Sequence, residues 1–214
     1  MSSPTSIPRS GLFQAPGRPL APARTEQVRR LLADEMSAAV ADQGLRVVNR
    51  GNTAVLILHG QDLGLTQICE FAEAALKRAV RRLTADLIGG ANVTRLDGVL
   101  ASRHPRLPYR RALRIVAGRG WRLSLGDELT PEAQASLVRF CNHLPVQVML
   151  LAGQPQPGQG DPHRSGLSYV VPWGGEALRA EVPAGDQTGP VVCRLHLDRL
   201  LQFVLGLDSD AVGG

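Results

Sequence analysis

Apolar residues recur every three or four positions in several separate parts of the chain, as expected for helices with one buried face. This spacing predicts helices over residues 25–43, 65–83, 108–118, 130–143 and 197–205. Thr25 is expected to cap the first helix and Gly44 to end it. Thr130 is followed by proline, a pair that is typical of a helix start.

Runs of β-branched and aliphatic residues lie between and after these helices and predict strands. They cover residues 45–48, 53–58, 145–151, 167–171, 177–182 and 190–196. Short turns such as Pro172–Gly175 join several of them as hairpins. Helices come early and strands mostly late, which favours an α+β fold: an antiparallel β-sheet flanked by helices, which we expect on one face of the sheet.

Three segments lack a pattern that could bury a face. Residues 1–24 contain five prolines among Ser, Gly and Arg, which is typical of a flexible arm. Residues 153–166 are nearly devoid of apolar side chains and predict a mobile loop, and residues 210–214 form a tail. Residues 25–209 are then a single domain.

Composition is that of a globular protein, with 43% hydrophobic residues over 214 positions. No apolar run approaches the roughly 20 residues that span a bilayer, and the N-terminus lacks the apolar core of a secretory signal. We therefore expect a cytoplasmic protein with no membrane partner. The three cysteines are an odd number without a Cys-x-x-Cys pair, so buried thiols are expected rather than a disulfide framework or a zinc site.

Positive charge is carried almost wholly by arginine, because Lys77 is the only lysine among 24 basic residues and the formal net charge is +5. The planar guanidinium suits bidentate binding of phosphate. Arginines gather on the polar sides of two predicted helices, where they are either a solvated surface or candidates for RNA contact. The candidates are Arg78, Arg81, Arg82, Arg110, Arg111 and Arg114.

Some single residues receive an ordinary structural interpretation. His59, His104 and His163 lie at predicted turns, where we expect them to be solvated. Trp121 is expected to enter a strand and to pack in the core. Asp198 is expected to cap the last helix.

The stretch from Pro190 onward changes from strand to helix at Leu-Asp-Arg199. This junction resembles motif 3 of class II aminoacyl-tRNA synthetases, a Gly-x-Gly-x-Gly-x-Glu/Asp-Arg series. In that family the glycines form a floor for the adenine of ATP, and the arginine meets the nucleotide. Arg199 remains in this chain, whereas Val192, Arg194 and His196 stand in place of the glycines.

Residues 107–148 resemble the aspartyl/asparaginyl subgroup of these synthetases. A "proline, aromatic, x, x, Ala" helix, a "Gly, Asp, x, Leu" turn, an acidic helix and a "Pro-Val" strand follow in the same order. Glu176 sits where the subgroup has the glutamate that holds ATP-bound magnesium. The helix and strand at 24–48 resemble motif 1, the dimer-forming element, which implies a homodimer.

Departures from the family pattern bear on activity. Residues 49–64 contain no Arg-x-Glu, the motif 2 sequence whose arginine grips the α-phosphate. Tyr169 occupies the place of the acidic residue that binds the ammonium of the amino acid, and Leu178–Val182 replaces a glycine-rich stretch. Adenylate formation needs fixed cations, because charge accumulates on the phosphoryl oxygens in the transition state. These losses indicate an inactive site.

The resemblance therefore implies a truncated and degenerate paralogue of the aspartyl/asparaginyl-tRNA synthetase catalytic core: a non-catalytic binding or regulatory module without a cofactor. The alternative is an active ATP-dependent enzyme that forms an aminoacyl adenylate, either an aminoacyl-tRNA ligase or an asparagine synthetase. In that case Glu176 binds Mg²⁺ and Arg199 binds ATP. A further alternative is an arginine-rich RNA-binding protein that contacts tRNA or another RNA.

Overall fold

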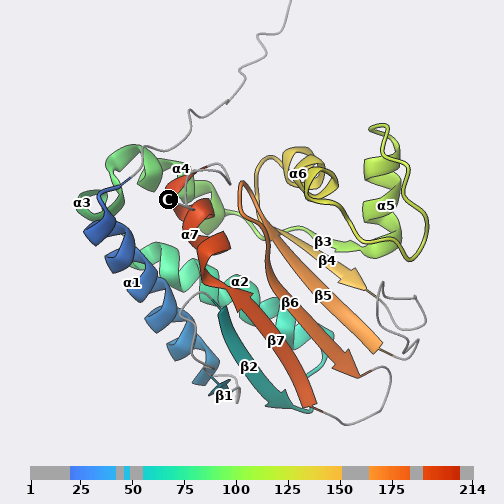
Figure 1. Ribbon diagram of the computed structural model, residues 1–214, viewed down its shortest axis with the longest axis horizontal. Helices are drawn as coiled ribbons and strands as arrows, with labels where there is room; N and C mark the ends of the chain where they lie inside the picture. The colour runs from blue at the N-terminus through green and yellow to red at the C-terminus, as the bar shows by residue number, and fades with distance from the viewer. Residues whose placement is uncertain (1–19, 42–45, 49–54, 151–163, 184–189, 208–214) are drawn as a thin grey trace, which may run out of the picture.

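The computed structural model describes residues 20–41, 46–48, 55–150, 164–183 and 190–207 (Figure 1). In chain order, the elements are α1 (Pro22–Ala41), β1 (Arg46–Val48), β2 (Val55–Gln61), α2 (Leu65–Arg82), α3 (Ala85–Ile88), α4 (Gly90–Ala101), β3 (Arg106–Pro108), α5 (Tyr109–Ala117), α6 (Pro131–Phe140), β4 (Val146–Leu150), β5 (Arg164–Val171), β6 (Gly175–Pro183), β7 (Pro190–His196) and α7 (Leu197–Leu205).

All the described strands belong to one seven-stranded sheet with the order β1-β2-β7-β6-β5-β4-β3. Neighbours pair antiparallel, except for the parallel pair of β3 and β4. The pairing of β2 with β7 joins distant parts of the chain, with Val55 opposite His196 and Gln61 opposite Pro190. The expected α+β fold with an antiparallel sheet is confirmed.

The main core lies between one face of the sheet and helices α1, α2, α4 and α7. Alternate residues of each strand supply it, as the period of two along a strand requires. On β6 and β7 they are Leu178, Ala180, Val182, Val191, Cys193 and Leu195. Cys69 and Cys193 are buried here, and burial raises their pKa to about 11 and about 12, so both thiols stay protonated at neutral pH.

A smaller core lies on the opposite face of the sheet, beneath α5 and α6. It contains Val146 and Val148 of β4 and Val170 of β5. Val148 lies directly opposite Ser168, whose side chain points away from the main core. The expectation that all helices lie on one face is therefore wrong: α5 and α6 cover part of the other face and leave the rest of it open.

The two predicted helix starts have different outcomes. Thr130 caps α6 as expected, because its hydroxyl accepts a hydrogen bond from the backbone N–H of Ala133 at 3.3 Å. Thr25 is not a cap. The helix α1 already begins at Pro22, a tolerated first helical residue, and the Thr25 hydroxyl donates backward to the carbonyl of Ala21 at 3.4 Å.

Parts of the sequence prediction lie outside the described residues, namely Gly44, His163, most of the arm and loop, and the tail. Within the expected arm and loop, α1 begins at Pro22 and β5 begins at Arg164. Trp121 is half-buried against the smaller core but lies in an irregular segment after α5, so the expected strand there is wrong. Among the described helices, none combines the length and apolar character that crossing a bilayer requires.

Arg95 of α4 ties the turn between β5 and β6 to the end of α7. Its Nη2 donates to the carbonyls of Phe203 and Val204 at 2.6 and 2.5 Å. The guanidinium also lies 4.8 Å from the ring centroid of Trp173 in the turn. Burial lowers the pKa of Arg95 to about 10, so the group remains a cation at neutral pH and interacts favourably with the carbonyl end of the helix.

Candidate functional site

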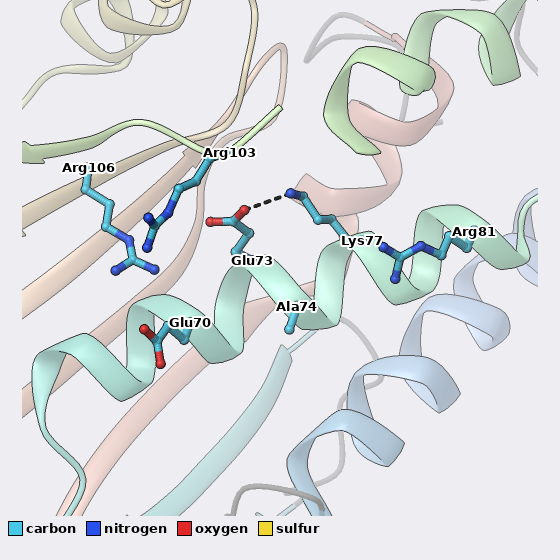
Figure 2. Close-up of a pocket in the computed structure, with 7 residues that line it drawn as sticks. All are labelled: Glu70, Glu73, Ala74, Lys77, Arg81, Arg103 and Arg106. Carbon is cyan, nitrogen blue, oxygen red and sulfur yellow. Dashed lines mark hydrogen bonds and ion pairs between the residues drawn. The ribbon is translucent and has the colours of Figure 1, made fainter. Parts of the chain in front are cut away.

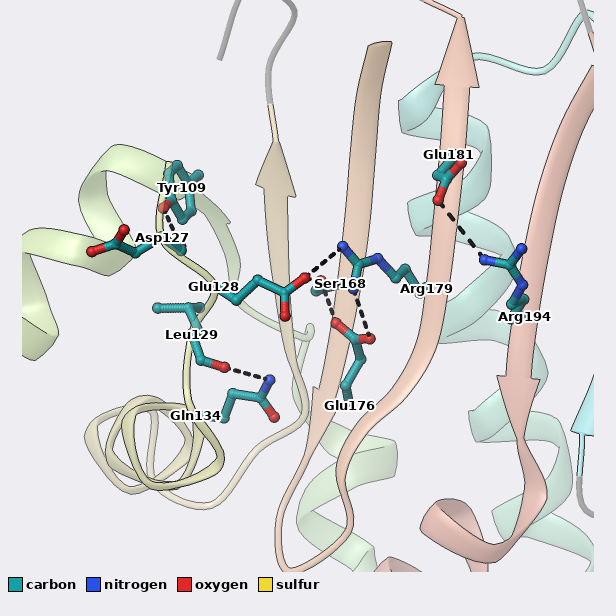
Figure 3. Close-up of polar contacts among 10 residues, drawn as sticks. All are labelled: Tyr109, Asp127, Glu128, Leu129, Gln134, Ser168, Glu176, Arg179, Glu181 and Arg194. Carbon is teal, nitrogen blue, oxygen red and sulfur yellow. Dashed lines mark hydrogen bonds and ion pairs between the residues drawn. The ribbon is translucent and has the colours of Figure 1, made fainter. Parts of the chain in front are cut away.

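Charged side chains occupy the open face of the sheet, on the side away from α2 (Figure 3). The same alternation that places Leu178 and Ala180 in the main core places Arg179 and Glu181 on this face. On β7, Val192, Arg194 and His196 point the same way, because Arg194 pairs with Arg179 and Val192 with Glu181. The residues that replace the motif 3 glycines thus stand on the open face together.

These groups form ion pairs and hydrogen bonds among themselves. The hydroxyl of Ser168 donates to Oε2 of Glu176 at 2.6 Å, and Arg179 lies 3.9 Å from the other oxygen, Oε1. Arg194 lies 3.9 Å from Oε1 of Glu181. We name this surface the polar sheet face: Ser168, Glu176, Arg179, Glu181 and Arg194. Each of its two carboxylates therefore already faces a cation of the same chain.

The loop that precedes α6 adds a third carboxylate. Glu128 accepts hydrogen bonds from both Nη atoms of Arg179 at 3.2 and 3.3 Å. The loop is fixed by local bonds: the hydroxyl of Tyr109 donates to the carbonyl of Asp127, and Gln134 of α6 donates to the carbonyl of Leu129 at 3.1 Å. The "Gly, Asp, x, Leu" turn thus holds Glu128 over Arg179.

Glu176 and Arg199, the two candidate ATP ligands, belong to segments in direct contact. Gly174, in the turn before β6, packs against the backbone of Arg199 at the start of α7. The Arg199 side chain is exposed and has no hydrogen bond or ion pair with the described residues. Its neighbour Asp198 is not the expected cap: it lies in the first turn of α7 and pairs with Arg29 of α1 at 2.9 Å.

Tyr169 lies on the other side of the sheet from the polar sheet face, in the main core. Its hydroxyl is 2.6 Å from Nδ1 of His104, and Nε2 of His104 is 3.3 Å from the carbonyl of Val99. A carbonyl can only accept, so Nε2 carries the proton and Nδ1 accepts from Tyr169. Tyr169 therefore offers no acidic group for an amino-acid ammonium.

His104 is only 1% exposed, so the expectation of a solvated histidine is wrong. Burial lowers its pKa to about 4, although the carboxylate of Glu73 partly opposes this effect. The ring is therefore neutral at physiological pH. No local sequence pattern indicates this pair, because residues 104 and 169 meet only after the sheet has formed.

The candidate RNA-contacting arginines have different surroundings. Arg78 and Arg82 both pair with Glu35 of α1, at 2.8 and 3.1 Å, and so bind α2 to α1. The remaining candidates are exposed on α2 and α5: Arg81, Arg110, Arg111 and Arg114. Two of the six thus have a structural partner.

Metal-ligand side chains do not cluster in the described residues: within these ranges, no three His, Cys, Asp or Glu side chains lie close enough to hold a metal ion. Glu176, which the enzyme alternative assigns to magnesium, accepts a hydrogen bond from Ser168 and faces Arg179.

No protein-family model matches the sequence, and no curated protein matches it by sequence. Solved structures match the fold. Asparaginyl-tRNA synthetase from Pyrococcus horikoshii is 14% identical with a TM-score of 0.65, over 87% of this chain and 65% of that chain. Its complex with asparaginyl-adenylate gives a TM-score of 0.64 at 14% identity, over 87% of this chain and 66% of that chain.

An aspartyl tRNA synthetase from Entamoeba histolytica is 12% identical with a TM-score of 0.57, over 86% of this chain and 56% of that chain. The described residues therefore have the class II synthetase fold of the asparaginyl and aspartyl enzymes, as the motifs implied. This chain spans less than two thirds of the length of these proteins.

Proposed function

We propose that this chain is a degenerate paralogue of the aspartyl/asparaginyl-tRNA synthetase core and acts as a non-catalytic binding or regulatory module. The observation that carries this proposal is the set of internal ion pairs on the polar sheet face. Glu176, which the resemblance assigns to magnesium, has Ser168 and Arg179 at its two oxygens. A ligand would have to displace both partners.

Side-chain bulk supports the same conclusion. A floor for adenine needs a bare backbone, and here Val192, Arg194 and His196 project from that strand onto the open face. Arg194 extends toward Glu181 on the neighbouring strand. The nucleotide would therefore meet side chains where the family has glycine.

The residues present do not fit a magnesium–ATP complex or an aminoacyl adenylate. Magnesium is usually bound through one or two carboxylates together with substrate phosphates, and the carboxylate of Glu176 is engaged within the chain. The chain segment 49–64 supplies no Arg-x-Glu for the α-phosphate, and Tyr169 is buried against His104. We therefore derive no catalytic step from this face.

We also propose that the module is a homodimer that pairs through β1 and the polar side of α1. The strand β1 is at one edge of the sheet, so one side of its backbone is unpaired within the described chain. The apolar face of α1 does not require a partner, since Val28, Leu32 and Met36 are buried in the main core of the same chain. In the described part of the segment that resembles motif 1, β1 and the polar side of α1 therefore remain for two-fold pairing.

The experiment is an ATP–pyrophosphate exchange assay with aspartate and with asparagine. We expect no exchange above a blank without protein. A Glu176→Gln variant, assayed beside the wild type, identifies contamination by a host synthetase, because a contaminant is unaffected by the substitution. Exchange that is present in the wild type and lost in Glu176→Gln would overturn the proposal and establish the enzyme alternative.

A further inference from the structure

A second charged depression lies along α2, on the far side of the sheet from the polar sheet face (Figure 2). Its volume is about 340 Å³. One wall consists of α2 residues at spacings of three and four, which share one helix face. The other wall is the segment after α4 together with the first residue of β3. We name it the α2 groove, lined by Glu70, Glu73, Ala74, Lys77, Arg81, Arg103 and Arg106.

Two of the charges neutralise each other. Lys77 donates to Oε1 of Glu73 at 2.8 Å, and the two side chains are only 16% and 12% exposed. Burial disfavours the carboxylate, but the hydrogen bond and charge of Lys77, together with the charge and backbone hydrogen bond of His104, outweigh this effect and lower the pKa of Glu73. Glu73 and Lys77 therefore form an ion pair of zero net charge at neutral pH. The net charge of the groove is determined by the other four ionisable side chains.

Positive charge is in excess among these four. Arg81, Arg103 and Arg106 make no hydrogen bond or ion pair with the described part of the chain, and Glu70 is likewise unpaired. Three guanidinium groups thus oppose one carboxylate. The excess of two positive charges equals the charge of a phosphate dianion.

Arg106 is the arginine of the groove that most clearly lacks a hydrogen-bond acceptor among the described residues. It is half-buried, and its Nε is shielded from solvent without a hydrogen-bond acceptor among the described residues. A partly desolvated cation without a partner is unfavourable. Figure 2 shows that Arg103 and Arg106 extend into the same end of the groove, above Glu70. Two like charges directed into one space are stabilised when an anion lies between them.

We propose that the α2 groove binds a phosphomonoester, whose phosphate is held by the guanidinium groups of Arg103 and Arg106. Guanidinium forks donate parallel hydrogen bonds to phosphate oxygens, which gives both affinity and orientation. Arg81 lies at the opposite end of the groove and contacts the remainder of the ligand. Glu70 opposes the anion and limits the affinity.

The source of the phosphate is either a small metabolite or the 5′ end of a nucleic acid. The test is a calorimetric titration of the full chain with inorganic phosphate at constant ionic strength. It is followed by titrations with one short RNA in two forms, with a 5′-phosphate and with a 5′-hydroxyl. Circular dichroism of each variant verifies that it is folded.

We expect saturable binding of inorganic phosphate, weakened about tenfold or more in Arg103→Ala and in Arg106→Lys, which keeps the charge but loses the fork. Glu70→Gln should strengthen binding, because it removes the opposing charge. Arg139→Ala, in an exposed arginine of α6 outside the groove, is the matched control and should leave the affinity unchanged. Absence of saturable binding, or equal weakening by Arg139→Ala, overturns the proposal.

The two RNAs distinguish the sources. Tighter binding of the 5′-phosphorylated form, with the difference lost in Arg103→Ala, identifies a nucleic-acid end. Binding of inorganic phosphate, with no preference between the two RNAs and no effect of Arg103→Ala on either RNA, identifies a small phosphomonoester. If both RNAs bind equally and both are weakened by Arg103→Ala, the groove recognises backbone phosphodiesters, and the monoester proposal is wrong. None of these results depends on the polar sheet face, so this proposal and the proposed function can fail separately.

Discussion

Gly174 packs so closely on Arg199 that a Cβ added to the glycine would lie 2.1 Å from the carbonyl oxygen of the arginine. This contact seats the β5–β6 turn on the first turn of α7. Packing therefore requires glycine at 174, whether or not a nucleotide is bound. The same contact brings the segments of Glu176 and Arg199 together.

Substitution of Gly174 by alanine should destabilise the fold by about 1–3 kcal/mol or more, because the obstructing atoms belong to the backbone and cannot rotate away. Gly98→Ala in α4 is the matched control. Its Cβ would meet nothing within 4 Å, and alanine should stabilise the helix by roughly 0.5–1 kcal/mol. Urea unfolding of both variants measures the difference, and equal midpoints would contradict the close contact.

Arg199→Ala should change the free energy of unfolding by about 0–1 kcal/mol, the range for an exposed charge, because the side chain has no ion pair or hydrogen bond with the described residues. ATP with magnesium should raise the melting temperature of neither the wild type nor the variant. A rise in the wild type that disappears in Arg199→Ala would show that the arginine binds nucleotide.

Stability should depend on pH through His104. Burial lowers the pKa of this group to about 4, from the ordinary 6.5, so the unfolded chain takes up a proton that the folded protein resists. The contribution of the neutral ring to the free energy of unfolding is therefore complete above about pH 6.5. It is lost as the pH falls toward 4, which lowers the free energy of unfolding by up to roughly 3 kcal/mol.

The non-titrating variant His104→Asn should have a shallower slope when unfolding is measured between pH 5 and 6.5. The lowered pKa values of His143 and His196 contribute to the slope in both proteins, and the contribution of Glu73 is lost only below its ordinary pKa of 4.5, so the difference between the two slopes reports on His104. Parallel stability curves for the wild type and the variant would show that His104 is not buried in its neutral form.

Arg95→Met should destabilise the protein by about 1.5–3 kcal/mol, the range for hydrogen bonds to charged groups, because the carbonyls of Phe203 and Val204 lose their donor. The emission of Trp173 should shift as well, since the guanidinium lies over its ring. Arg119→Met is the control: this arginine is exposed and lies 5.3 Å from the ring of Phe140, without buried carbonyl partners. It should alter neither property.

Light scattering at micromolar concentration should give the mass of a homodimer. This expectation follows from the unpaired edge of β1 and the resemblance of its segment to motif 1. A monomer mass across a tenfold concentration series would count against pairing through that edge.

Local sequence patterns predicted local structure well. The Thr130–Pro131 start, the apolar spacing of α7 and the alternation along β7 each depend on a few neighbouring residues, and each is confirmed. The region of α3 and α4 was not predicted, because Gly89, Gly90 and Gly98 interrupt its helical pattern. Thr25 was misassigned because a hydroxyl residue fits both a cap and a helix interior.

The sequence could identify the motif residues of the candidate site but not the contacts between them. The sequence singled out Glu176, Arg199 and the three residues that replace the glycines, and the structure shows that these three residues share one strand face. The sequence did not show that Arg179 links Glu176 to Glu128, because these residues come from β6 and from a loop about 50 residues away. The burial of His104 and the opposed walls of the α2 groove likewise depend on tertiary packing.

The pairing of β2 with β7 also determines the order in which the molecule can assemble. Val55 finds its partner His196 only after about 140 further residues have left the ribosome. Until then, one edge of β2 is open to association with other chains. Because the closing contacts are this distant, folding should be slow for a chain of this size. Deletion of β7 and α7 would divide the sheet into β1-β2 and β6-β5-β4-β3, and we expect such a product to aggregate rather than fold.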